Sequence, residues 1–191
     1  MARWEPGARE RMVVAAVDLF IEQGYDVTTV AQIAERAGVT RSTFFRHFSD
    51  KRDVLVAGQA TLSHLLAEGI EQAPASAGPL EAVAAGLERA SNEMGPLNRE
   101  LGPRLKAAVA ASAELRERDA LKHIGLADAM TTALLARGVP EPAAHLAAEM
   151  GVLAFKRGYA RWSETDSGTT GLAPYTVAAL AELRAAGAAL G

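Results

Sequence analysis

The residues best suited to chemistry lie together in one short basic stretch of the chain. Positions 36–52 hold one acidic residue, Asp50, against the basic residues Arg36, Arg41, Arg46, Lys51 and Arg52, with His47 among them. Guanidinium and ammonium groups bind phosphate, and the arginine fork also pairs with the guanine edge in the major groove. The stretch therefore indicates a surface that binds nucleic acid, with an ordinary solvated basic face as the alternative.

The charge of the remaining chain is compatible with such a surface. The 191 residues carry a net charge of −3, and acidic residues are in excess only after position 55. A basic patch on an acidic body binds phosphates locally, while the rest of the charge keeps the protein in solution.

A short helix over residues 41–48 is expected to present these groups. Thr40 is a suitable N-cap for it. Phe44 and Phe48 are four residues apart, so they share a face and can pack inward. The residues that point away are Arg41, Ser42, Phe45 and Arg46, with Thr43 and His47 at the margins. An outward Phe45 suits contact with a thymine methyl group or a sugar; the alternative is that it covers a neighbouring helix.

Two preceding segments are expected to hold this helix in place. The apolar spacing of Val13, Ala16, Val17 and Phe20 predicts a helix over 9–23 that ends at Gly24. Thr29 and Gln32 suit a capping box for a second helix, which ends at Gly38. Two short helices joined by a tight turn with glycine are typical of a helix-turn-helix, whose second helix enters the major groove.

Residues 9–56 resemble the TetR family of repressors in the type and spacing of their residues. The matching positions are Ala15-Ala16-Val17-Asp18-Leu19-Phe20, Gly24-Tyr25, Thr28-Thr29-Val30, Ile33-Ala34, Ala37-Gly38-Val39, Ser42-Thr43-Phe44-Phe45-Arg46-His47-Phe48, Lys51 and Leu55. The chain departs from the family at Phe45, where the family usually has tyrosine. The missing hydroxyl removes one phosphate hydrogen bond, worth on the order of 1 kcal/mol, and leaves the aromatic contact.

The resemblance implies a homodimer that binds a palindromic operator in double-stranded DNA, and a repression that a small-molecule effector relieves. Carried onto this chain, it implies DNA contacts by Thr29, Arg41, Ser42, Thr43, Phe45, Arg46, His47 and Lys51. It also implies a minor-groove or phosphate contact by Arg3. The operator, the effector, the regulated genes and the sign of regulation do not follow from it.

The predicted fold is all-α, with a helix-turn-helix DNA-binding domain over residues 1–55 and a helical effector-binding and dimerisation domain over 56–191. Aromatic residues make up 5% of the chain and alanine is abundant, a composition that favours helix. A fourth helix is predicted to run unbroken from Asp50 to about Gln72, with Ser49 as its cap. A ligand that moves this helix would then change the orientation of the helix-turn-helix. Breaks at glycine and proline divide the rest into helices over about 80–94, 97–111, 113–137, 141–162 and 172–188.

The last two of these helices are the expected dimer interface. Small residues recur along them at Ala143, Ala147, Gly151, Ala154, Gly158, Ala178, Ala181, Ala185 and Ala188. Small side chains let helix axes approach closely, and leucines beside them supply apolar area. Packing within one subunit is the alternative, although the family's habit of pairing its last two helices favours the interface.

The effector is expected to bind in an apolar cavity of the C-terminal domain that has a few polar groups. The candidate lining residues are Met94, Leu105, His123, Met130, Phe155, Tyr159 and Trp162. Plain core packing is the alternative for each of them, because apolar helix stripes mostly form core. Residues 97–137 are also weakly similar to regulators tied to mycofactocin and acyl-CoA metabolism.

Enzymatic functions find little support in the sequence. The chain has no cysteine, which excludes disulfides and thiolate metal sites, and it lacks a nucleophile elbow, a phosphate-binding loop and an HExxH motif. His145 and Glu149 have the spacing of a metal pair, but an exposed helix pair is the simpler interpretation. We therefore expect no enzyme activity, metal or cofactor.

The remaining alternative is a helical protein-interaction module without DNA binding, which the cations Arg41, Arg46 and Lys51 disfavour.

A cytoplasmic location without membrane association is expected. The first seven residues lack the apolar core of a signal peptide, and no uncharged apolar run of about 18 residues occurs. The absence of cysteine is compatible with a reducing compartment.

Overall fold

The computed structural model of the protein describes residues 7–165 and 170–190, so Arg3 lies outside the described residues. Within these ranges the chain is helical and contains no strand, which confirms the predicted all-α fold class. The elements are α1 (Ala8–Gln23), α2 (Val30–Arg36), α3 (Arg41–His47), the 3-10 helix η1 (Lys51–Val56), α4 (Gln59–Gln72), α5 (Pro79–Ser91), α6 (Pro96–Ala111), α7 (Ala113–Ala136), α8 (Glu141–Glu164) and α9 (Ala173–Ala188). No helix of the described part has both the length and the apolar character needed to cross a bilayer.

The residues pack into two units. The first comprises residues up to Ala57 together with Pro103–Ala120, and the second comprises Gly58–Gly102 together with the chain from Leu121 onward. α6 and α7 therefore each contribute residues to both units. The predicted boundary after residue 55 did not foresee the contribution of Pro103–Ala120 to the first unit. The division of roles between residues 1–55 and 56–191 stays a prediction.

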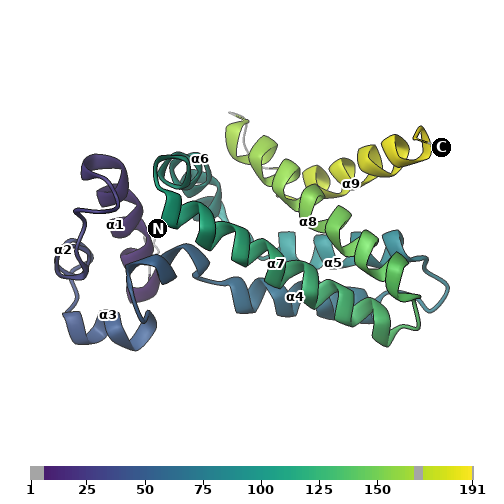
Figure 1. The fold of residues 1–191 in the computed structure, drawn as a ribbon, viewed down its shortest axis with the longest axis horizontal. Coiled ribbons are helices and arrows are strands. Elements are labelled where there is room, and N and C mark those ends of the chain that lie inside the picture. Colours follow the sequence, from purple (N-terminus) through teal and green to yellow (C-terminus); the bar gives the residue numbers. More distant parts are fainter. Residues whose placement is uncertain (1–6, 166–169, 191) are drawn as a thin grey trace, which may run out of the picture. The chain divides into compact units, whose positions relative to one another are not determined.

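In the first unit α1, α2 and α3 pack around one apolar cluster (Figure 1). Phe20 of α1, Ile33 of α2 and Phe44 of α3 are buried in it, and Leu115 of α7 joins them. Thr29 caps α2 as its sequence context predicts: the Gln32 side-chain oxygen accepts from the Thr29 amide at 2.8 Å, and the Thr29 hydroxyl accepts from the Gln32 amide at 3.2 Å. Local caps and a shared core thus fix the two helices of the helix-turn-helix.

The predicted unbroken helix from Asp50 to Gln72 is wrong. η1 ends at Val56, and α4 begins at Gln59 after Gly58, whose φ is +85°. Side chains with a Cβ avoid this left-handed conformation, so glycine allows the break. The cap also differs from the expected Ser49, because the Asp50 carboxylate accepts from the amides of Arg52 at 2.7 Å and Asp53 at 3.1 Å.

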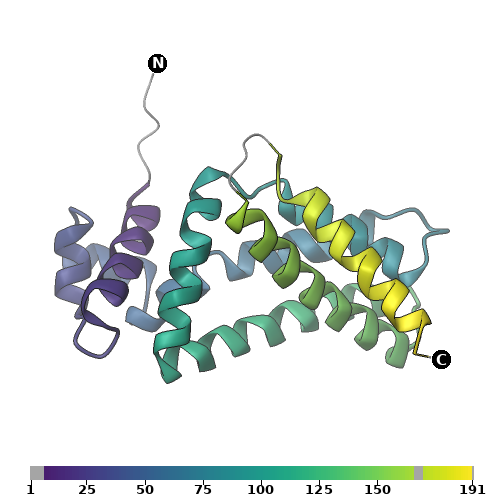
Figure 2. The same cartoon turned by 90° about the horizontal axis from the view of Figure 1, so that it is seen from above.

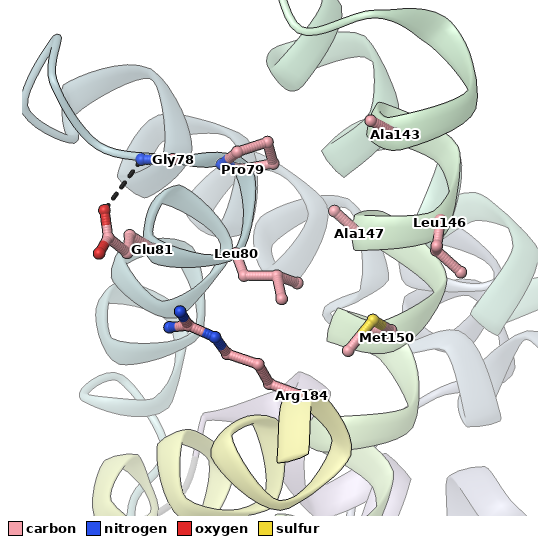
Figure 3. A pocket seen from close by; sticks show the side chains of 9 residues that line it. All are labelled: Gly78, Pro79, Leu80, Glu81, Ala143, Leu146, Ala147, Met150 and Arg184. Carbon is pink, nitrogen blue, oxygen red and sulfur yellow. Dashed lines mark hydrogen bonds between the residues drawn. The ribbon is translucent and has the colours of Figure 1, made fainter. Parts of the chain in front are cut away.

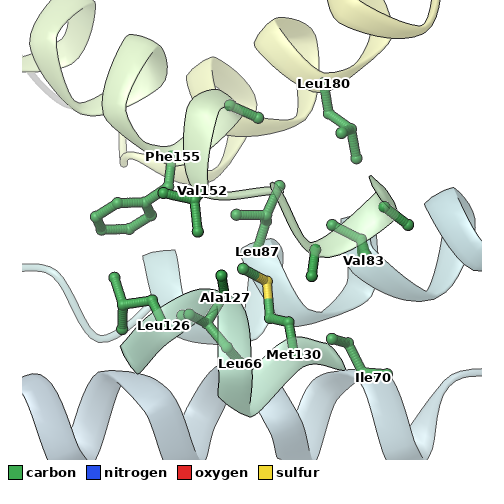
Figure 4. Packing of buried hydrophobic residues seen from close by; sticks show 14 of the residues in the cluster. Leu66, Ile70, Val83, Leu87, Leu126, Ala127, Met130, Val152, Phe155 and Leu180 are labelled. Carbon is green, nitrogen blue, oxygen red and sulfur yellow. The ribbon is translucent and has the colours of Figure 1, made fainter. Parts of the chain in front are cut away.

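α5 is the central helix of the second unit and contacts α4, α8 and α9. Its Val83 and Leu87 are buried among side chains of the neighbouring helices, including Leu66 of α4 and Val152 of α8 (Figure 4). α8 and α9 lie side by side (Figures 1 and 2). A buried hydrogen bond of 3.1 Å between the hydroxyls of Ser91 and Thr176 joins α5 to α9.

Candidate functional site

α3 has one buried and one exposed face. Phe44 is fully buried, and its ring centroid lies 5.4 Å from that of Phe48. On the outer side Phe45 leaves 51% of its surface exposed, and Arg41 and Arg46 are exposed as well. The helix therefore displays an aromatic ring and two cations while two phenylalanines anchor it from behind.

The cations of the basic stretch differ in how far they are already engaged. Arg36 pairs with Glu22 at 2.6 Å, and Arg52 pairs with Asp50 at 2.6 Å. The Lys51 ammonium donates to three main-chain carbonyls of the loop between α1 and α2. By contrast, within the described residues the side chains of Arg41 and Arg46 form no hydrogen bond or ion pair. These two arginines are the cations of the stretch that are available to a ligand.

The other predicted DNA contacts are placed as follows. Ser42 and His47 are exposed, whereas Thr43 is half-buried. The hydroxyls of Thr29 and Thr43 take part in the caps of α2 and α3, the latter lying 3.0 Å from the Thr40 hydroxyl. Which nucleic-acid atoms these groups contact stays a prediction.

Sequence reasoning missed two ion pairs that fasten Pro103–Ala120 within the first unit. Arg104 pairs with Asp18 of α1, and Arg118 pairs with Asp53 of η1 at 2.6 Å. Leu105 and Ala108 add apolar contacts to the same cluster. No local pattern signals these pairs, because Asp53 and Arg118 are 65 positions apart in the chain.

The predicted pocket residues are divided between the two units. Met130, Phe155 and Trp162 are buried in the apolar cluster of the second unit, with Met94 and Tyr159 packed against it. Leu105 packs in the cluster of the first unit. His123 is half-buried on α7. The structure thus gathers five of the candidates in one cluster, and their contact with an effector stays a prediction.

The polar groups of this cluster already have partners. The Tyr159 hydroxyl donates to the Asn98 carbonyl, and the Trp162 indole N–H donates to the Thr170 carbonyl at 2.9 Å. Burial raises the pKa of Tyr159 to about 12, so its hydroxyl stays protonated at neutral pH. An effector that enters here has to displace these internal hydrogen bonds or use other groups.

A surface pocket of about 400 Å³ lies elsewhere in the second unit, between α5, α8 and α9 (Figure 3). Leu80, Leu146 and Met150 give it an apolar lining, and the Arg184 side chain extends from α9 toward α5. Glu81 beside it caps α5 by accepting from the Gly78 amide at 2.9 Å. None of the seven predicted pocket residues lines this pocket. In the described ranges no group of three or more His, Asp or Glu residues is placed to hold a metal ion.

Comparison with known proteins finds a family match within the first unit. Residues 13–57 match the family model described as bacterial regulatory proteins, tetR family. The HTH-type transcriptional regulator TcmR of Streptomyces glaucescens is 39% identical over 75 residues, which are 39% of this chain and 33% of that protein. The HTH-type transcriptional regulator SrpR of Pseudomonas putida is 43% identical over 58 residues, which are 30% of this chain and 27% of that protein. The match thus spans a third or less of the length of these relatives.

Solved structures extend the likeness to most of the chain. The transcriptional regulator FadR of Bacillus subtilis, solved with stearoyl-CoA, has a TM-score of 0.58 at 20% identity and covers 91% of this chain and 96% of its own. The TetR-family repressor FadR of Thermus thermophilus, solved with lauroyl-CoA, has a TM-score of 0.52 at 24% identity and covers 92% of this chain and 93% of its own. These structures share the fold. Residues 13–57 thus match the tetR family of bacterial regulatory proteins, and most of the chain shares its fold with these solved regulators.

Proposed function

We propose that this protein is a sequence-specific DNA-binding transcriptional regulator whose α3 enters the major groove. The observation that carries the proposal is the outer face of α3. There Arg41 and Arg46 are exposed and form no hydrogen bond or ion pair with the part of the chain that the structure describes, and the Phe45 ring is half exposed. A guanidinium at the start of a recognition helix suits the two acceptors of guanine, and an aromatic ring suits the thymine methyl group. Thr29, Ser42, Thr43 and His47 are the further contacts of this proposal.

The proposed regulator acts as a homodimer on a palindromic operator, with α8 and α9 as the interface. Leu146 and Leu153 of α8 leave 63% and 40% of their surfaces exposed, and α9 exposes Ala178, Ala181 and Ala185. Part of the small-residue pattern serves the subunit itself. A Cβ on Gly158 would lie 2.6 Å from the Thr176 backbone, so this glycine lets α8 and α9 approach each other. The exposed leucines and alanines are therefore what support a second copy.

The proposed regulator is a repressor whose operator affinity falls when a small molecule binds. Two structures of the same fold hold acyl-CoA molecules, so acyl-CoA thioesters are the first effectors to test. A coupling of about 1–3 kcal/mol between effector and operator is typical of such switches. The expected readout is a weaker operator complex in the presence of the matching thioester.

Selection of bound sequences from random duplexes by the purified protein tests the DNA-binding function. The expected result is a palindromic consensus with half-sites about 34–36 Å apart, or a multiple of this spacing. Arg41→Ala is expected to relax the preference at one base pair of each half-site and to weaken operator binding by about 1–3 kcal/mol.

Arg36→Ala is the matched control, because Arg36 is a basic residue of the same stretch that is paired with Glu22. It should leave the consensus unchanged. The proposal is contradicted if no sequence is enriched, or if both variants select the same consensus as the parent with the same affinity.

A further inference from the structure

We propose that Lys51 is a positioning residue that closes the helix-turn-helix on itself, and not a phosphate contact. The inference rests on the proposed DNA-binding function and differs from the phosphate contact that the family resemblance implies for this lysine. It assigns the ammonium group of Lys51 to the protein's own main chain.

The contacts of Lys51 use all of its hydrogen-bonding capacity. Its Nζ lies 2.6 Å from the carbonyl oxygen of Tyr25, 2.9 Å from that of Thr28 and 3.2 Å from that of Asp26. An ammonium group has three N–H donors and no acceptor, so three carbonyls satisfy it. The same Nζ lies 4.1 Å from the centroid of the Tyr25 ring, close enough for a cation–π attraction. No donor is left over for a phosphate oxygen.

The position of these carbonyls gives the contact its structural meaning. Thr28 immediately precedes Thr29, the N-cap of α2, and Lys51 follows Phe48, the C-cap of α3, by three residues. A bond between residues 28 and 51 therefore joins the two ends of the segment that contains α2, the turn and α3. By this closure Lys51 restricts the angle between the two helices, and with it the direction in which the outer face of α3 points.

The loop whose carbonyls accept the Lys51 hydrogen bonds is itself fixed by packing and by other hydrogen bonds. Tyr25 is buried, and its ring meets that of Phe20 edge-on with 5.2 Å between centroids. Burial and a hydrogen bond to the Glu114 side chain raise the pKa of Tyr25. The Thr28 hydroxyl donates to the Gly24 carbonyl at 2.7 Å. Because this loop is already ordered, only the Lys51 side chain has to lose conformational freedom when the three hydrogen bonds form. A single lysine can therefore hold the two ends of the helix-turn-helix together.

Lys51→Met tests the clamp, because methionine keeps an unbranched apolar stem and removes the donors and the charge. Operator affinity is expected to fall by about tenfold, the value of one charged hydrogen bond, while binding to a duplex without the operator changes by less than about twofold. The slope of log affinity against log salt should stay that of the parent. Arg46→Met is the matched control and should reduce the magnitude of that slope by about 0.9, because it removes an available cation.

A phosphate contact predicts the opposite set of results. In that case Lys51→Met would reduce the slope by about 0.9 and weaken operator and non-operator duplexes alike. Lys51→Arg, which keeps the charge, would then bind like the parent. The clamp predicts a loss of operator affinity for Lys51→Arg too, because a planar guanidinium cannot reproduce three convergent N–H donors.

A measurement on the DNA-free parent separates this inference from the proposed function. The Nζ protons of Lys51 should exchange with water more slowly by nuclear magnetic resonance than those of Lys156, which is exposed on α8. Equal exchange rates would overturn the clamp whether or not the protein binds DNA. Slow exchange in a protein that binds no duplex would support the clamp and reject the DNA-binding function. This readout also holds if Lys51→Met fails to fold.

Discussion

The acidic side chains next to α3 stabilise the local fold through a helix cap and ion pairs. Asp50 caps η1 and pairs with Arg52. Asp53 accepts from the Ser49 amide at 3.1 Å and pairs with Arg118 at 2.6 Å. Burial is the largest influence on Asp53 and raises its pKa, but hydrogen bonds from Ser49 and the charge of Arg118 outweigh it, so the pKa is lowered overall. These carboxylates are thus charged and locally compensated, which limits their repulsion of a DNA backbone.

The lowered pKa of Asp53 makes the stability of the protein depend on pH in the acid range. The unfolded pKa is about 3.9, so the stabilisation is present above this pH and is lost as pH falls through the lower folded value. Asp53→Asn is expected to lower the free energy of unfolding at pH 7 by about 1 kcal/mol and to flatten its fall below about pH 4. Urea unfolding at a series of pH values from about 3 to about 7, a range that includes the unfolded pKa, measures both effects. Asp26→Asn, at an exposed carboxylate of the same unit, is the control; identical profiles for the two variants would contradict the assignment.

At the scale of elements, close helix crossings depend on glycine. A Cβ on Gly69 of α4 would lie 2.7 Å from the Ala85 carbonyl oxygen of α5, and one on Gly86 of α5 would lie 2.6 Å from the Leu66 carbonyl oxygen of α4. Both contacts are shorter than carbon and oxygen tolerate, and both involve backbone that cannot rotate away. The α4–α5 pair therefore forms only with hydrogen atoms at these two positions.

Gly69→Ala is expected to lower the free energy of unfolding by about 1–3 kcal/mol, because the helices must move apart. Gly187→Ala is the matched control. Gly187 is also helical, but a Cβ there meets nothing within 4 Å. The control should be neutral or stabilising by up to about 1 kcal/mol, since alanine is the better helix former. Denaturant unfolding compares the two, and a Gly69→Ala variant as stable as the parent would show that the crossing is not tight.

At the scale of the whole molecule, the proposed dimer explains why long apolar side chains of α8 are exposed to solvent in the single chain. Leu146 and Leu153 are seven residues apart on α8, so they share one face of the helix. Beside them, the exposed alanines of α9 offer little side-chain bulk to a partner. An apolar face of small and large residues suits burial against a second copy, whereas single exposed leucines elsewhere need no explanation.

Leu146→Glu combined with Leu153→Glu is expected to convert the dimer to a monomer, because the partner would have to bury carboxylates. Sedimentation or light scattering measures the mass, and operator binding should weaken by at least about tenfold once the half-sites are bound independently. Leu135→Glu is the control, at a leucine of α7 that is 43% exposed. A double variant that remains dimeric would place the interface elsewhere.

Sequence alone predicted much of the fold and the outer face of the candidate site. Apolar spacing and capping residues placed helices close to their observed bounds, and the i, i+4 spacing of Phe44 and Phe48 correctly divided α3 into a buried and an exposed face. The unbroken fourth helix was the main error, because its stop depends on the backbone conformation of Gly58.

What the sequence by itself determined is what neighbouring residues specify: the helices, their caps and the direction of each side chain relative to its own helix. Only the tertiary structure showed that Lys51 turns back onto the loop before α2, that Pro103–Ala120 pack in the first unit, and that Leu105 does not join Met130 and Phe155. The physical reason is the distance along the chain over which each interaction acts. Helix periodicity acts over a few residues, whereas the partner of each apolar or charged face is chosen by packing among segments that are distant in the chain.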